Sequence, residues 1–182
     1  MNHVTSDASA RQRVTVMQGQ VKVSAHPDML LTTVLGSCVA ACLFDPEAGV
    51  GGMNHFLLSE PVSGRGTTAD EHYGVYLMEL LINEMLSQGA FKRRMKAHLY
   101  GGANLHAGMQ RIGTVNGAFA REFLAREGIP LTHSDLGGTH ARRVDFLPEI
   151  GRARSRHVHD ARAIELTPVN RPVRATGDVE LF

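Results

Sequence analysis

The chain has 182 residues, of which 43% are hydrophobic and 20% are charged, a composition typical of one soluble globular domain. The two cysteines, Cys38 and Cys42, are too few for a disulfide framework, and their spacing differs from C-x-x-C redox or zinc pairs. The formal net charge of +1 provides no basic field for nucleic acid, and no apolar run reaches the length of a membrane span. We therefore expect a cytoplasmic protein without nucleic-acid binding, membrane insertion, metal or cofactor.

Residues 1–13 are polar and aperiodic, which predicts a disordered tail followed by a single domain over 14–165. The sequence does not indicate whether the C-terminal tail, 166–182, is ordered. Alternating valines between Val14 and Val23 favour β structure, and the apolar run from Met29 to Leu35 predicts a buried strand.

The segment after this strand predicts a β-hairpin. Two apolar runs flank the sequence DPEAG at 45–49, in which a proline followed by a glycine is typical of a short hairpin loop. A helix capped by Ser37 is the alternative, but it would meet Pro46 within about two turns. The β-branched Val39 also favours the strand.

Farther along the chain, helices and strands alternate. A polar loop over 59–69 precedes a helix capped by Asp70 and stopped by Gly89. The pattern then predicts a strand at 95–100, a helix at 114–126 and strands at 131–134 and 142–147. The arginines from Arg142 to Arg156 predict a solvated or partner-facing edge, and from 152 onward the chain reads as an Arg-rich tail.

The hairpin predicts a pairing of chemical interest. If its turn is centred between Pro46 and Glu47, Cys38 and His55 lie directly opposite each other, with Cβ atoms roughly 4.5–5.5 Å apart. A neighbouring imidazole can take the proton of a thiol and hold a thiolate–imidazolium pair, which is a nucleophile with an attached general acid. The alternative is that Cys38 and His55 are ordinary buried residues, which is the reading we keep for Cys42.

The residues around Cys38 predict the rest of a catalytic site. A sharp turn at Gly36 would free the amides of Ser37 and Cys38 to stabilise an oxyanion. Thr32 or Thr33 on the preceding strand could orient the imidazole through its second ring nitrogen. Because neighbouring strand residues face opposite ways, only one of the two threonines can do so, and the sequence leaves the choice open.

Several segments resemble the CheD family, the chemoreceptor glutamine deamidases of bacterial chemotaxis. They are LGSCVAACLFDPEAGVGGMNHFLL, HYGVYLMELLINEML, GGANL, IGTVN and the pattern D-x-GG-x-x-A-R, and together they span roughly residues 14 to 150. The resemblance implies a cysteine hydrolase that converts receptor glutamines to glutamate through a thioester and releases ammonia. It implies Cys38 as nucleophile, His55 as its histidine and Thr32 as the third member of the triad.

The resemblance also implies a fold and partners. We expect an α+β fold, a layered sandwich of β-sheets flanked by helices, similar to deamidating toxins of the cytotoxic necrotising factor type. The expected partners are chemoreceptor cytoplasmic domains as substrate and a CheC-type phosphatase. A non-catalytic module that binds the phosphatase or the receptors is the alternative function, and a peptidase using the same dyad is a third possibility.

Overall fold

The computed structural model describes residues 11–58, 68–105 and 111–158. Most of the expected tail over 1–13, most of the loop over 59–69, the end of the expected domain beyond residue 158 and the tail over 166–182 lie outside the described residues. In chain order the elements are β1 Gln12–Thr15, β2 Val21–Ser24, β3 Met29–Leu35, β4 Val39–Asp45, β5 Val50–Asn54, α1 Thr68–Ser87, the 3-10 turn Lys92–Arg94, β6 Lys96–Gly101, α2 Ile112–Arg126, β7 Leu131–Leu136, β8 Ala141–Leu147 and β9 Arg152–Val158. Within these ranges no helix is long and apolar enough to cross a bilayer.

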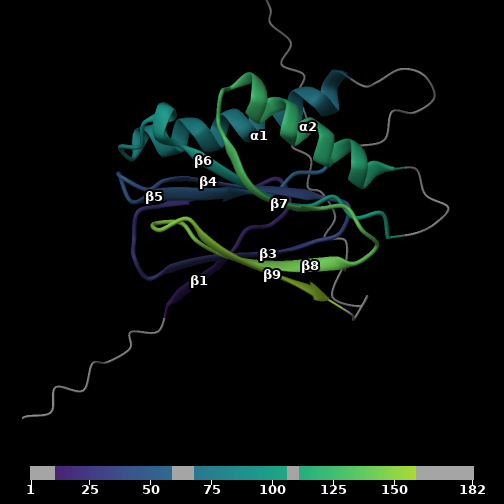
Figure 1. Ribbon diagram of the computed structural model, residues 1–182, viewed down its shortest axis with the longest axis horizontal. Helices are drawn as coiled ribbons and strands as arrows, with labels where there is room; N and C mark the ends of the chain where they lie inside the picture. The colour runs from purple at the N-terminus through teal and green to yellow at the C-terminus, as the bar shows by residue number, and fades with distance from the viewer. Residues whose placement is uncertain (1–10, 59–67, 106–110, 159–182) are drawn as a thin grey trace, which may run out of the picture.

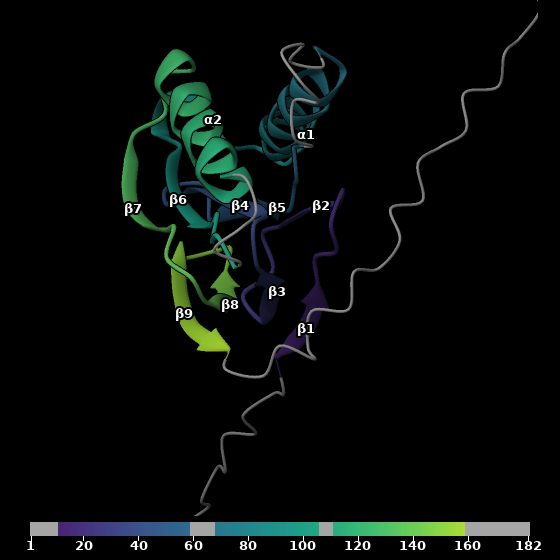
Figure 2. The same cartoon turned by 90° about the vertical axis from the view of Figure 1, so that its right-hand side faces the viewer.

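These elements form three layers (Figures 1 and 2). A four-stranded sheet has the order β1-β3-β8-β9, and a five-stranded sheet has the order β2-β5-β4-β6-β7. Helices α1 and α2 lie side by side on the outer face of the five-stranded sheet, and the four-stranded sheet packs against its other face (Figure 1). The expected α+β class is confirmed. Both described helices cover the same side, so they do not flank the pair of sheets from two sides.

Strand β4 separates two apolar layers by the alternation of its side chains. Val39, Ala41 and Leu43 belong to the core beneath the helices, whereas Ala40 and Cys42 belong to the core between the sheets. All seven residues of this strand are buried, which explains why its sequence is almost continuously apolar. A strand covered on both faces can present a side chain to the inter-sheet layer at every second position.

The expected hairpin is confirmed, but its register differs. Asp45 pairs with Val50 and Cys42 with Met53, so directly opposed residues have numbers that sum to 95 instead of 93. Pro46 to Gly49 form the loop, in which the Asp45 carboxylate accepts the amides of Glu47 (3.1 Å) and Ala48 (3.2 Å). Gly49 closes the loop with a φ of +64°, a conformation that favours glycine.

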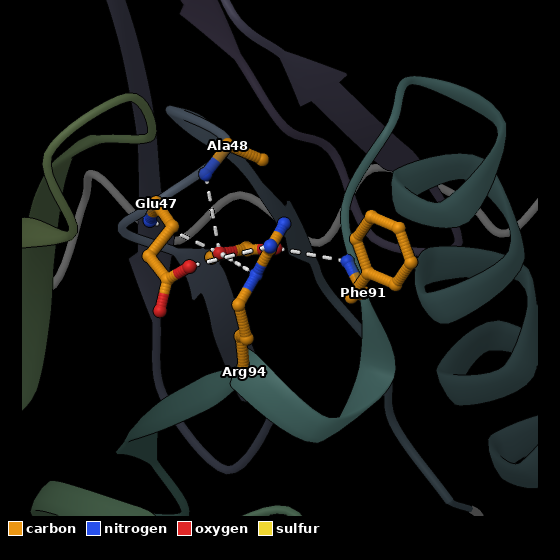
Figure 3. Close-up of polar contacts among 5 residues, drawn as sticks. Glu47, Ala48, Phe91 and Arg94 are labelled. Atoms are coloured by element: carbon orange, nitrogen blue, oxygen red, sulfur yellow. Dashed lines mark hydrogen bonds and ion pairs between the residues drawn. The ribbon is translucent and has the colours of Figure 1, made fainter.

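A long-range ion pair holds this turn in place (Figure 3). The side chain of Asp45 is fully buried, and it accepts hydrogen bonds from the amide of Phe91 (2.8 Å) and from Nη2 of Arg94 (2.8 Å). Burial raises the pKa of this carboxyl, but its hydrogen bonds, that from Arg94 foremost, outweigh the effect and lower the pKa to about 2. The register of the hairpin is therefore coupled to a segment more than forty residues away.

The first and last described strands differ from expectation. Strand β1 begins at Gln12, two residues before the expected boundary. Strand β9 occupies Arg152–Val158, where the sequence reads as a tail, and it pairs with β8 over seven residues. Arg142 is fully buried, not solvated, and its guanidinium donates to the carboxylate of Asp135 (2.6 Å) and to the carbonyl of Gly137. It thus stabilises the turn between β7 and β8.

Candidate active site

The loop that carries Cys38 connects β3 to β4 and is held from one side. Carbonyl oxygens of its three residues accept hydrogen bonds from the amide of Ala103 (to Gly36, 2.9 Å), from Nδ2 of Asn116 (to Ser37, 3.0 Å) and from the amide of Gly102 (to Cys38, 2.7 Å). A trans peptide directs its N–H opposite to its C=O, so the amides of Ser37 and Cys38 point away from these donors. This is the orientation that an oxyanion site at Ser37 and Cys38 requires.

Gly101 permits this close approach. Its φ is +108°, and a Cβ at this position would overlap the carbonyl oxygen of Cys38. The glycine pair at 101–102 is therefore a point of close backbone contact with the loop that carries Cys38, and the amide of Gly102 provides a hydrogen bond.

His55 follows β5, and its ring is fastened through Nδ1. Thr33 on β3 donates its hydroxyl proton to the carbonyl of Val16 at 2.8 Å, so its oxygen is free to accept from Nδ1 of His55 at 2.9 Å. The carbonyl of Val16, which only accepts, lies 3.3 Å from the same nitrogen. Both contacts require the proton on Nδ1, and therefore leave the lone pair on Nε2.

The Nε2 atom of His55 is buried and has no hydrogen-bond partner among the described residues. A buried, unpartnered acceptor costs free energy, and in native proteins it indicates a function or an absent ligand. A lone pair held in this way is available to accept the proton of a nucleophile or of a substrate.

The threonine that bonds to His55 is Thr33, whereas the resemblance implies Thr32. The hydroxyl of Thr32 donates to the carboxylate of Asp145 on β8 at 2.8 Å. Thr33 contacts Val16 and His55 on the inter-sheet face of β3, and successive side chains of a strand point to opposite faces. The hydroxyl that contacts the imidazole in this structure is therefore that of Thr33, and Thr32 contacts Asp145 instead.

Cys38 and His55 share a face but are not directly opposed. Val39 pairs with Phe56, in the same register as the rest of the hairpin. This register places Cys38 opposite Leu57, which is two residues along the strand from His55. The expected direct pairing is therefore wrong. Because the shift is even, both side chains remain on the inter-sheet side, where Cys38 packs against the inter-sheet core and His55 contacts Val16. Diagonal neighbours of this kind are about 7–8 Å apart, within reach of a long side chain.

Burial sets the protonation of this pair. Desolvation raises the pKa of Cys38 to about 12, although a hydrogen bond from its own backbone amide lowers it. Desolvation lowers the pKa of His55 to about 4, although the bond to the Val16 carbonyl raises it. Burial therefore favours the neutral thiol and the neutral imidazole over the thiolate–imidazolium pair expected from the sequence.

Asn116 is a site residue that the sequence reasoning missed. It is fully buried in α2, and besides binding the Ser37 carbonyl it accepts the amide of Leu58 at 2.8 Å. One side chain thus joins the loop that carries Cys38 to the segment that follows His55. A polar residue on an otherwise apolar helix face, within the IGTVN segment, is the signal that could have found it.

The second cysteine belongs to the core. Cys42 is fully buried between the sheets, and burial raises the pKa of its thiol well above the ordinary range. Cys38, by contrast, is partly exposed. Of the two thiols, only Cys38 is accessible to a substrate.

Comparison with known proteins adds a family to this geometry. The model of a family described as CheD chemotactic sensory transduction matches residues 57–157. The chain is 52% identical over 172 residues to a protein of Zymomonas mobilis, covering 94% of this chain and 93% of that protein. It is 47% identical over 180 residues to a protein of Caulobacter vibrioides, covering 97% and 96%. Both relatives are named probable chemoreceptor glutamine deamidase CheD.

Among solved structures, the Bacillus licheniformis hypothetical protein YfiH has a TM-score of 0.42 and 14% identity, over 65% of this chain and 51% of that chain. A likeness this distant adds nothing to the assignment. The sequence relatives decide it: this chain belongs to the CheD family.

Proposed function

We propose that this chain is a protein-glutamine glutaminase that deamidates chemoreceptors, with Cys38 as nucleophile and His55 as general base and acid. The observation that carries the proposal is the Nε2 atom of His55, which is buried and unpartnered among the described residues, on the face of the hairpin that also bears Cys38. The names of the relatives supply the substrate class, the side-chain amide of a receptor glutamine.

In the proposed reaction, His55 Nε2 takes the thiol proton as Cys38 Sγ attacks the glutamine Cδ. The resulting oxyanion is bound by the amides of Ser37 and Cys38, which face away from the contacts that hold their loop. The imidazolium then protonates the departing nitrogen, the C–N bond breaks, and ammonia leaves a thioester. Water, deprotonated by His55, hydrolyses the thioester and restores the thiol.

Neutral resting forms are compatible with this cycle. Burial disfavours both the thiolate and the imidazolium, so proton transfer from Cys38 to His55 is coupled to attack. The transfer is favoured only when Sγ can form a bond to the glutamine Cδ of a bound substrate. Thr33, through its bond to Nδ1, keeps the ring in the tautomer that can accept the proton. Gly36 allows the turn that precedes the nucleophile, because Leu105 packs where a Cβ of residue 36 would lie.

The test is mass spectrometry of a purified receptor cytoplasmic domain after incubation with the protein. Wild type and Cys42→Ala should convert specific glutamines to glutamate, and Cys38→Ala should not. Equal conversion by Cys38→Ala and wild type would overturn the proposal, and cleavage of the receptor chain would indicate a peptidase.

A non-catalytic binding module is the second candidate, and the raised pKa of Cys38 favours it, since a neutral thiol is a poor nucleophile. On this reading the protein engages receptors or a CheC-type phosphatase without chemistry. Receptor binding by wild type, measured by titration calorimetry, together with no conversion of any glutamine would support it.

The remaining expectations extend the proposal. They are a cytoplasmic location, where receptor cytoplasmic domains are accessible, and a similarity of fold to toxins of the cytotoxic necrotising factor type. The proposal also assigns substrate selection to the polar loop over 59–69, most of which lies outside the described residues.

A further inference from the structure

A glutamine that the mechanism above does not use touches the nucleophile. Gln18 lies in the connection between β1 and β2, and its Oε1 accepts a hydrogen bond from Sγ of Cys38 at 3.6 Å. Gln18 is half-buried. Its carboxamide is the side-chain group that the structure places in hydrogen-bond contact with this thiol.

The backbone around Gln18 is fastened to His55 on both sides. The amide of Gly19 donates to the carbonyl of His55 at 2.7 Å, and the amide of His55 donates to the carbonyl of Gln20 at 3.1 Å. On the other side of Gln18, the carbonyl of Val16 accepts from Thr33 at 2.8 Å and lies 3.3 Å from Nδ1 of His55. The segment that carries Gln18 is therefore positioned by the same residues that position the imidazole.

The turn itself is also well defined. The side chain of Gln20 accepts the amide of Met17 at 3.1 Å, and Gly19 has a φ of +81°, which favours glycine. A Cβ at Gly19 would approach the hydroxyl of Tyr73 on α1 to 2.5 Å. Gln18 thus reaches the thiol from a constrained backbone, not from a freely moving loop.

A carboxamide can serve both protonation states of its partner. Its oxygen accepts from a neutral S–H, as observed, and its NH₂ group, on the same carbon, can donate two hydrogen bonds. The terminal torsion of glutamine is broad and roughly two-fold, so half a turn exchanges oxygen for nitrogen at little cost. When the thiol proton moves to His55, the contact between sulfur and oxygen becomes repulsive and that between sulfur and NH₂ becomes attractive.

We propose that Gln18 is a further catalytic residue, whose carboxamide holds the neutral thiol of Cys38 before reaction and then donates Nε2–H to the anion that forms. This inference rests on the proposed function. The negative charge develops first on Sγ, as the thiol proton leaves, and then on the tetrahedral oxyanion, whose oxygen is bonded to the carbon that Sγ attacks. Gln18 then supplements the amides of Ser37 and Cys38 as a donor, and no bond of Gln18 itself is made or broken.

Two variants separate the donor from the shape of the side chain. Gln18→Met removes the donor and approximates the volume, whereas Gln18→Glu keeps the shape and sets a carboxylate beside the sulfur. We expect kcat for receptor glutamines to fall about 100-fold in Gln18→Met with little change in KM, since this is the usual effect of removing one oxyanion donor. Gln88→Met, at an exposed glutamine of the turn after α1, is the matched control and should leave kcat unchanged.

A second measurement needs no substrate, so it distinguishes failure of this inference from failure of the proposed function. The alkylation rate of Cys38 by iodoacetamide reports the thiolate as pH rises, in a Cys42→Ala background. We expect the profile to move to higher pH in Gln18→Met and farther in Gln18→Glu. A wild-type alkylation profile together with a kcat within twofold of wild type in Gln18→Met would overturn the inference.

The mass of the enzyme after turnover gives a third outcome. Gln18 should remain a glutamine, because its carboxamide acts as a ligand for the anion. Conversion of Gln18 to glutamate in wild type, absent in Cys38→Ala, would show that this side chain is a substrate of its own nucleophile, and would overturn the donor role.

Discussion

The buried polar groups near the two ends of strand β4 differ in their hydrogen bonding. At one end the carboxylate of Asp45 is buried and saturated, with hydrogen bonds from two amides of its own turn, the amide of Phe91 and the guanidinium of Arg94. At the other end, near Cys38, the Nε2 atom of His55 is buried and unsatisfied within the described part of the chain.

This difference separates stability from chemistry. A saturated buried charge resists substitution, because removing one partner leaves the other desolvated and unpaired. An unsatisfied buried nitrogen is a cost to folding that is retained where its lone pair has a use. The turn end of β4 therefore sets the register of the hairpin, and the other end carries the candidate reaction.

The largest expected effect is on stability, from a substitution at the turn end of β4. Asp45→Asn should lower the free energy of unfolding by about 3 kcal/mol, because the buried carboxylate accepts from the amides of its turn, from Phe91 and from Arg94, and a carboxamide has only one oxygen to meet these donors. The folded pKa of Asp45, about 2, is below its ordinary value, so the contribution is present at neutral pH and is lost as pH falls toward 2. Urea denaturation at several pH values measures both.

Glu47→Gln is the control for that variant. Glu47 also pairs with Arg94, at 3.3 Å, but its side chain is 71% exposed. We expect a loss of no more than about 0.5 kcal/mol. An equal loss in the two variants would contradict the idea that the buried carboxylate holds the turn.

A smaller effect, and one on rate, is expected at the site end. Thr33→Val removes the nearer of the two acceptors for Nδ1 of His55 and leaves the Val16 carbonyl at 3.3 Å, so the ring and its tautomer are held less firmly. We expect kcat to fall about 10- to 100-fold with KM little changed, as for a modest misplacement of a catalytic group.

Thr32→Val is the matched control on the same strand. It removes a hydroxyl bonded to Asp145, so it should change stability more than kcat. A greater loss of kcat in Thr32→Val than in Thr33→Val would return the orienting role to Thr32.

The smallest expected effect is a pH dependence of stability from His55. Burial lowers its folded pKa from 6.5 to about 4, so the unfolded chain takes up a proton at a pH where the folded chain does not. Stability should therefore fall as pH decreases through this range, by about 1 kcal/mol between about pH 7 and about pH 5.5. The part of this slope due to His55 should be missing in His55→Gln, and an identical slope in both proteins would contradict the buried, neutral imidazole.

Much of the fold follows from local patterns. Strand β3, both helices and the two strands of the hairpin lie within a few residues of their expected bounds, because apolar periodicity and turn residues are local signals. Strand β9 was missed although its arginines alternate with smaller residues, since their charge resembles that of a solvated tail. Those arginines point outward from an edge strand, where charge is tolerated.

Local sequence patterns also predicted part of the candidate site. Side chains of a strand alternate between the two faces of a sheet, so a register shift of two residues leaves Cys38 and His55 on the same face. The sequence by itself therefore determined that the thiol and the imidazole lie on one face of the hairpin.

Only the tertiary structure decided which partners the pair has. The register depends on how Asp45 closes its turn and binds Arg94, a contact between residues 49 positions apart. The choice of Thr33 over Thr32 depends on which face of β3 meets the second sheet, and the contact of Gln18 depends on a turn held by His55. The neutral resting state depends on burial, because desolvation is a property of the packed molecule and not of any one segment.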